Sequence, residues 1–187
     1  MTTGLECWPV ERRSVLISSL VAFAIVLAVD FLYVTLINAQ GASDDMPYVP
    51  RFIAGFLALM AALIVIALMP RKEIVAVRVP MRAAAAAGLL AIGLLGAMTI
   101  GLPLVAAGIL AAVALGRTDP VQGSWRRRLA GLLAAIASIA VLLVGIDAAE
   151  RVIVCPQFGT SGGGGTYLLG GSYRYECNNG ELHMTSG

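Results

Sequence analysis

Long apolar runs separated by short charged segments dominate the chain. A helix needs roughly 20 apolar residues to cross the ~30 Å hydrocarbon layer of a membrane. Four regions come close to that length or exceed it, and basic residues flank them, as is typical of membrane spans. They are about 14–38, 52–69, 83–116 and 129–147. We therefore expect an all-α membrane protein in which residues 1–149 form a helix bundle in the lipid bilayer.

The third apolar region is too long for one span. As a single helix, its 34 residues would extend about 51 Å, which is more than tilting normally absorbs. Near its middle, Gly101 permits a turn and Pro103 suits the first turn of a new helix. We predict two short helices, 83–98 and 102–116, forming a hairpin, and hence five spans. One kinked or partly re-entrant element is the alternative.

The basic residues give an orientation. With five spans and a cytoplasmic N-terminus, ten Lys and Arg residues lie on the inner side and three on the outer side, as the positive-inside rule requires. With four spans, the Arg triplet moves outside and the contrast weakens. Trp8 and Trp125 fall at the inner boundary, where indole rings anchor. The inner set is Arg12, Arg13, Arg71, Lys72, Arg78, Arg82, Arg117, Arg126, Arg127 and Arg128; the outer set is Arg51, Arg151 and Arg174.

This distribution predicts a multi-pass protein of the cell membrane with an extracytoplasmic C-terminus. The first apolar run resembles the start of a signal peptide, because Arg12 and Arg13 precede it. It is, however, longer than the usual apolar core of about 7–15 residues. A cleaved signal peptide therefore remains only an alternative. The abundance of Ala and Gly is a compositional hint of a GC-rich bacterial genome.

Small residues recur at four-residue spacing in the predicted hairpin. In a membrane, helices associate through close packing of such residues, since lipid tails are as apolar as Leu. Each set lies on one helix face, so the two arms are expected to pack together. The same faces are also candidates for contact with a partner subunit or a second copy. The two sets are Gly93, Ala97 and Gly101, and Gly108, Ala112 and Gly116.

Asp30 is the one acid well inside a predicted span. A buried charge is costly there, so it should have a partner. Tyr33 at i+3 is one candidate, and Arg51 and Arg151 near the outer boundary are others. Asp30 is then either an ion or proton site or a paired carboxylate that fixes helix packing. Asp147, four residues before Arg151, is expected to form a surface ion pair with it.

The tail at 150–187 differs sharply from the bundle. Cys155 and Cys177 both lie in it, on the oxidising side, and a disulfide between them is expected. Free thiols or a metal pair are the alternatives.

The tail also carries strand patterns. Apolar or aromatic runs at 166–169 and 172–177 flank Gly170-Gly171, which is typical of a hairpin. Asn179-Gly180 precedes a third run at 181–184. We predict a small three-stranded meander, with Gly162–Gly165 as a flexible stretch before it. The second strand should place Tyr173, Tyr175 and Cys177 on one face, and Arg174 and Glu176 on the other.

The amino-acid composition and the absence of known motifs argue against several classes of function. The chain is 59% hydrophobic and 13% charged, with mean hydropathy +0.87 and net charge +2, so nucleic acid is not an expected partner. His183 is the one histidine, and no HExxH, Cys-x-x-Cys or P-loop pattern occurs. The inner loops are too short for a catalytic domain. We expect no catalytic residues, cofactor or metal.

These features favour a non-enzymatic accessory or structural subunit of a bacterial membrane complex, with protein partners or as a homo-oligomer. A small transporter or channel that uses Asp30 is one alternative. An outer-surface binding or sensing module formed by the tail is another.

Overall fold

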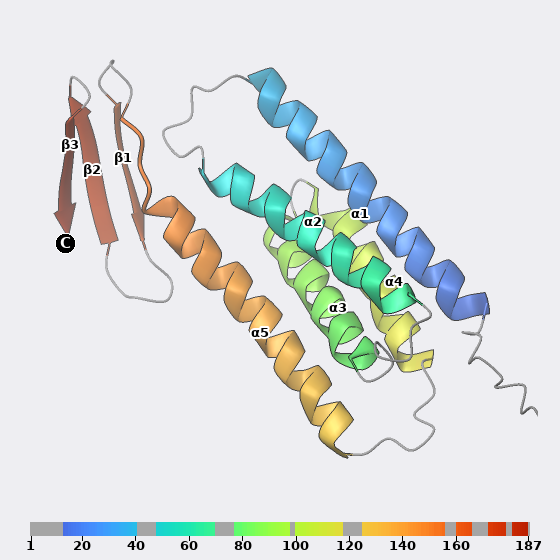
Figure 1. Ribbon diagram of the computed structural model, residues 1–187. Coiled ribbons are helices and arrows are strands. Elements are labelled where there is room, and N and C mark those ends of the chain that lie inside the picture. Colours follow the sequence, from blue (N-terminus) through green and yellow to red (C-terminus); the bar gives the residue numbers. More distant parts are fainter. Residues whose placement is uncertain are drawn as a thin grey trace, which may run out of the picture.

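The computed structural model describes residues 13–40, 48–69, 77–97, 100–117, 125–155, 160–165, 172–178 and 181–186. These residues form five helices and one small antiparallel sheet (Figure 1). Four helices are long and apolar enough to cross a membrane, and α4 is a shorter apolar helix of 17 residues. The helices are α1 (Arg13–Gln40), α2 (Tyr48–Leu68), α3 (Arg78–Leu95), α4 (Gly101–Arg117) and α5 (Trp125–Glu150).

The predicted hairpin is confirmed, because α3 and α4 are two helices and not one kinked element. The Gly96 amide donates to the Ile92 carbonyl at 2.9 Å and ends α3, and the Gly101 amide donates to the Gly96 carbonyl at 2.7 Å. The chain reverses within this turn and α4 returns along α3 (Figure 1).

Several helices begin earlier than the predicted spans. α3 starts at Arg78 instead of residue 83, and α5 starts at Trp125 instead of residue 129. Arginine is a good helix former, and Pro80 suits a first helical turn, so these helices continue beyond their apolar parts. The predictions that involve Trp8, Arg71-Lys72 and the strand at 166–169 lie outside the described residues.

α3 occupies the centre of the bundle. It contacts α2, α4 and α5, whereas α1 packs on α2 and α4 from the other side (Figure 1). The core is apolar, and its largest fully buried side chains come from all five helices. They are Val15, Val26, Leu57, Met60, Leu89, Leu104 and Leu142.

The two outermost helices, α1 and α5, bury narrow stripes. In α1 the buried positions alternate at spacings of four and three residues, which keeps them on one face. They are Val15, Ser19, Ala22, Val26 and Val29. In α5 the stripe includes Gly131, Ser138 and Leu142. The remaining faces of both helices expose many large apolar side chains.

The sheet has the order β1-β2-β3, with strands Thr160–Gly165, Ser172–Asn178 and Glu181–Ser186. The predicted second and third strands are present. The prediction that Gly162–Gly165 is a flexible stretch is wrong, because these residues belong to β1. Gly162 pairs with Tyr175, and a Cβ on Gly162 would collide with the Tyr175 ring. A ring that covers a strand glycine in this way explains why a Gly-rich segment pairs as a strand.

The alternation predicted for β2 is confirmed at the described side chains. Tyr175 and Cys177 are buried, whereas Arg174 and Glu176 are exposed. The side chain of Tyr173 lies outside the described set. The sheet lies beyond the carboxyl end of α5, at the end of the bundle where α1 finishes and α2 begins (Figure 1).

Candidate functional site

Polar side chains buried among the helices are the first candidates for a site. Within the described residues they come from three helices. Two of them were named from the sequence, Asp147 as a surface residue and Arg82 as an inner-loop residue. The four are Ser19, Arg82, Ser138 and Asp147.

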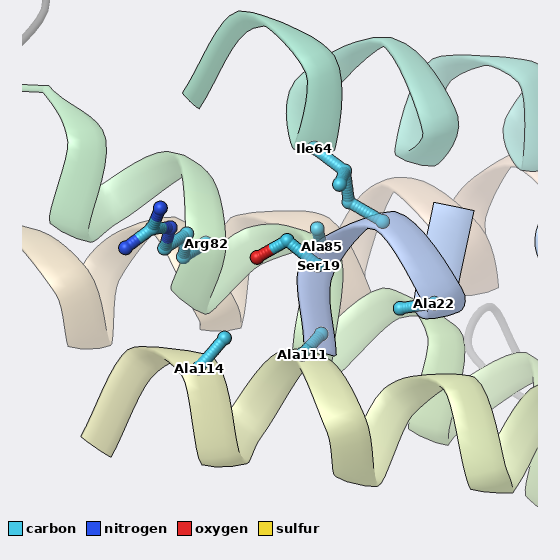
Figure 2. A pocket seen from close by; sticks show the side chains of 7 residues that line it. All are labelled: Ser19, Ala22, Ile64, Arg82, Ala85, Ala111 and Ala114. Atoms are coloured by element: carbon cyan, nitrogen blue, oxygen red, sulfur yellow. The ribbon is translucent and has the colours of Figure 1, made fainter. Parts of the chain in front are cut away.

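Arg82 and Ser19 line a small cavity where four helices meet (Figure 2). Each residue is 4% exposed, and the cavity has a volume of about 10 Å³, space for roughly one water molecule. Its other walls are apolar: Ala22, Ile64, Ala85, Ala111 and Ala114. The cavity is therefore too small for a substrate, and Ser19 and Arg82 are the polar residues that line it.

The sequence placed Arg82 in an inner loop, whereas the structure places it inside α3. Arg82 lies three residues before Ala85 and seven before Leu89, two fully buried residues. Helical periodicity puts all three on one face. This spacing is the signal that identifies Arg82 as an interior residue, once α3 is known to begin at Arg78.

Asp30 lies in the carboxyl-terminal half of α1. Its Oδ1 is buried and makes no hydrogen bond to the part of the chain that the structure describes, which includes Tyr33. The Arg51 guanidinium lies over the Tyr48 ring, 5.8 Å from its centroid. Arg151 pairs with Asp147 instead. In the described part of the structure, the two candidate arginines thus contact Tyr48 and Asp147.

The Asp147–Arg151 pair is present but is not a surface pair. Arg151 Nη2 lies 3.2 Å from Asp147 Oδ2, and the Asp147 side chain is 10% exposed against 45% for Arg151. Asp147 Oδ1 is buried and has no hydrogen-bond partner among the described residues. The exposed Arg151 thus pairs with one carboxylate oxygen of Asp147 at the carboxyl end of α5.

The small-residue faces of the hairpin meet each other in part. A Cβ on Gly93 would lie 2.8 Å from the Val105 amide nitrogen, and a Cβ on Gly108 would lie 2.8 Å from Leu90 Cγ. A Cβ on Gly101 would lie closer still, against the carbonyl oxygens of Gly93 and Gly96.

The packing stripes predicted for the hairpin extend too far. Ala97 is exposed, and Gly116 is exposed with nothing within 4 Å of a Cβ. Ala112 is half-buried. Both arms end near Ala97 and Gly116, so these positions have no facing helix.

Another close contact, absent from the sequence predictions, lies at Gly88. A Cβ there would be 2.6 Å from Ser138 Oγ, 2.7 Å from Met60 Sδ and 3.1 Å from Phe56 Cζ. The Ser138 hydroxyl also donates to Met60 Sδ at 3.8 Å. Gly88 is therefore the point at which α2 and α5 both approach α3.

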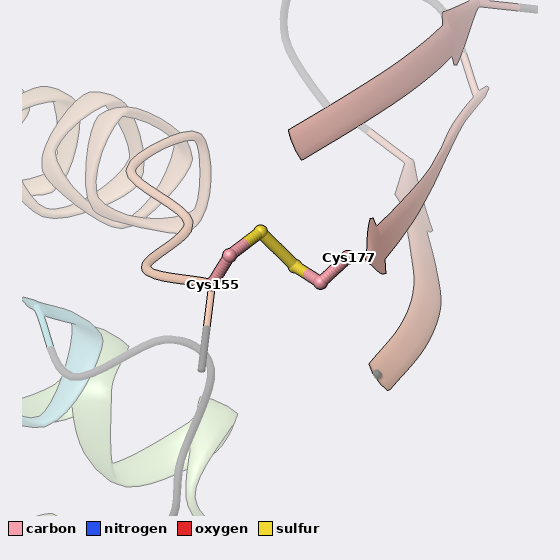
Figure 3. The surroundings of a disulfide bond; sticks show 2 residues. All are labelled: Cys155 and Cys177. Atoms are coloured by element: carbon pink, nitrogen blue, oxygen red, sulfur yellow. A yellow bond between two sulfur atoms is a disulfide. The ribbon is translucent and has the colours of Figure 1, made fainter. Parts of the chain in front are cut away.

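Within the tail, a disulfide between Cys155 and Cys177 links β2 to the segment that follows α5 (Figure 3). The two Cα atoms are 5.4 Å apart, an ordinary distance for such a bond. Cys177 is buried, and its neighbour across the sheet, Leu182, is exposed. The bond holds β2 close to the segment that leaves the last helix.

Metal ligands are not gathered in the described part of the chain, which contains no group of three or more His, Cys, Asp or Glu side chains. His183 lies exposed on β3. Comparison with protein-family models, with curated proteins and with solved structures finds no match.

Proposed function

We propose that this chain is a multi-pass membrane protein that acts as a non-enzymatic structural subunit of a bacterial membrane complex. Its five helices span the bilayer, with the N-terminus in the cytoplasm and the tail outside. The arginines support this orientation: Arg78, Arg117 and Arg126 lie at one end of the bundle, whereas Arg51 and Arg174 lie at the other (Figure 1). A disulfide in the tail fits an oxidising outer compartment.

The observation that carries the proposal is the closure of the bundle at its centre. Gly88 allows α2 and α5 to approach α3 within contact distance, and Leu57, Leu89 and Leu142 are 0% exposed. The interior is thus filled by side chains at the level where a transport pathway would pass. The apolar outer faces of α1 and α5 are left for lipid and for neighbouring subunits.

Isolation in mild detergent tests the proposal. We expect the tagged chain, expressed at its native level, to elute in light-scattering chromatography at the mass of a stoichiometric assembly. The same assembly should form after Asp30→Asn, since no step of the proposal uses that carboxylate. Elution as a lone monomer under conditions that preserve other membrane complexes would contradict it.

Asp30 favours a second candidate, a small transporter or channel. A carboxylate oxygen that is buried inside a proposed span, and has no hydrogen-bond partner among the described residues, is a candidate ion or proton site. In reconstituted vesicles, Asp30→Asn should then abolish ion-coupled flux, whereas Arg51→Gln should not. Absence of flux with the unaltered chain would remove this candidate.

A further inference from the structure

The first turn of α5 gathers exposed positive charge. Trp125 and the three arginines that follow it are exposed, and the arginines make no ion pair with the described residues. Two other arginines at this end of the bundle, Arg78 and Arg82, are placed differently. Arg78 donates from Nη2 to the Met69 carbonyl at 3.0 Å, and Arg82 is buried.

An apolar face continues directly from this charged turn. Trp125 lies four residues before Leu129, and Leu132 and Ile136 follow on the same helical face. All four side chains are exposed. The opposite face of α5 carries the stripe around Gly131 that packs on α3. The outward face of α5 is therefore cationic at its end and apolar along its next two turns.

We infer that this face binds an anionic phospholipid of the cytoplasmic leaflet, an inference that rests on the membrane insertion proposed above. Helical side chains tilt toward the N-terminus, so the guanidinium groups of Arg126, Arg127 and Arg128 extend from the helix end into the headgroup layer. Guanidinium matches the geometry of phosphate oxygens and forms two parallel hydrogen bonds to them. The backbone amides of the first turn add donors of the same polarity.

The acyl chains of the lipid pack against the apolar part of this face. Leu129, Leu132 and Ile136 offer the lipid tails a continuous apolar surface below the headgroup. The Trp125 ring lies at the interface between the two layers, where indole groups are favoured. A free anion makes no use of this apolar surface. The combination of charge and apolar surface therefore favours an intact lipid over free phosphate.

Native mass spectrometry of the detergent-purified full chain tests the inference. The probes are phosphatidylglycerol and phosphatidylcholine with identical acyl chains. We expect the unaltered chain to retain the anionic lipid preferentially. The double variant R126Q/R128Q should lose this preference by about tenfold or more, since each basic residue near anionic lipid contributes about fivefold. The matched control R51Q/R174Q removes two exposed arginines at the other end and should keep the preference.

Three results would overturn the inference. One is an unchanged preference in R126Q/R128Q; another is an equal loss in R51Q/R174Q. The third is displacement of the lipid by glycerophosphate at equal concentration, which would indicate a site for free anions. Retention of phosphatidylcholine by each variant verifies that its bundle is folded. A chain that stays in solution without detergent and retains neither lipid would contradict membrane insertion itself, whereas retention of both without preference contradicts the lipid site alone.

Discussion

Helices α3 and α5 show opposite relations between composition and burial. α5 is rich in Leu, Ile and Val, yet most of these side chains are exposed. α3 carries many Ala and Gly residues and two arginines, yet it is the central helix of the bundle. In a soluble protein the more apolar helix would be the more buried one. Under the proposed membrane insertion, apolarity serves contact with lipid, and small size serves contact between helices.

The largest expected effect comes from a Leu→Ala substitution in each helix. Leu89 in α3 is 0% exposed, whereas Leu132 in α5 is 58% exposed. Leu89→Ala should leave a cavity and lower the free energy of unfolding by roughly 2 kcal/mol or more. Leu132→Ala should change it by less than about 0.5 kcal/mol. Titration with SDS, followed by circular dichroism in mixed micelles, measures both. Equal losses would end the distinction between the two helices.

The next largest effect on stability is expected at Gly88, where α2 and α5 approach α3 closely. Gly88→Val puts a branched side chain against Ser138 and Met60, and overpacking of this kind costs about 1–3 kcal/mol. Gly55→Val in α2 is the matched control, because nothing lies within 4 Å of its Cβ. The two changes have the same effect on helix propensity, so the difference between their unfolding free energies isolates the packing term. We expect G88V to be the less stable variant, and the reverse order would refute the three-helix contact.

A smaller effect is expected where α5 meets α2. A Cβ on Gly145 would overlap the ring of Phe52, but Phe52 is half-buried and can turn aside. Gly145→Val should therefore cost about 1 kcal/mol, near the lower end of the overpacking range. Adding Phe52→Leu should recover part of that loss, which a double-mutant cycle of unfolding free energies detects. Strict additivity would show that the two residues do not touch.

The smallest effect on the bundle is expected from loss of the disulfide. Cys155 and Cys177 are 22 positions apart, and closing such a loop stabilises it by about 3 kcal/mol in the chain-entropy model. That stabilisation belongs to the sheet. In C155S/C177S, amide hydrogen exchange should therefore accelerate in β2 and β3, while SDS titration of the helices is unchanged. Destabilised helices would reveal a coupling between tail and bundle.

The sequence predicted the helices better than their ends. The 83–116 region was too long for one span, and Gly101 and Pro103 located the turn. The starts of α3 and α5 were missed because a charged residue ends an apolar run without ending the helix. The burial of Arg82 was missed for the same reason. Arg82 was assigned to a loop, so its position on a helical face was not considered.

Contacts between residues distant in the sequence were the second feature that could not be predicted. The predicted packing of small residues was correct at Gly93 and Gly108 but not at Gly116. Residue spacing alone does not show where a facing helix ends. β1 was missed because strand propensity disfavours glycine. The feature that makes its pairing possible is the Tyr175 ring over Gly162, a contact between residues far apart in the chain.

The disulfide also has a consequence for biogenesis. In the proposed orientation, Cys155 and Cys177 reach the oxidising compartment at different times, because Cys177 emerges only after the chain beyond α5 has been translocated. The S–S bond therefore records a completed passage of the tail across the membrane. A chain whose last helix has stalled or inserted backwards keeps both thiols reduced and open to a maleimide reagent. The same bond that connects β2 to α5 thus serves as a chemical marker of correctly inserted molecules.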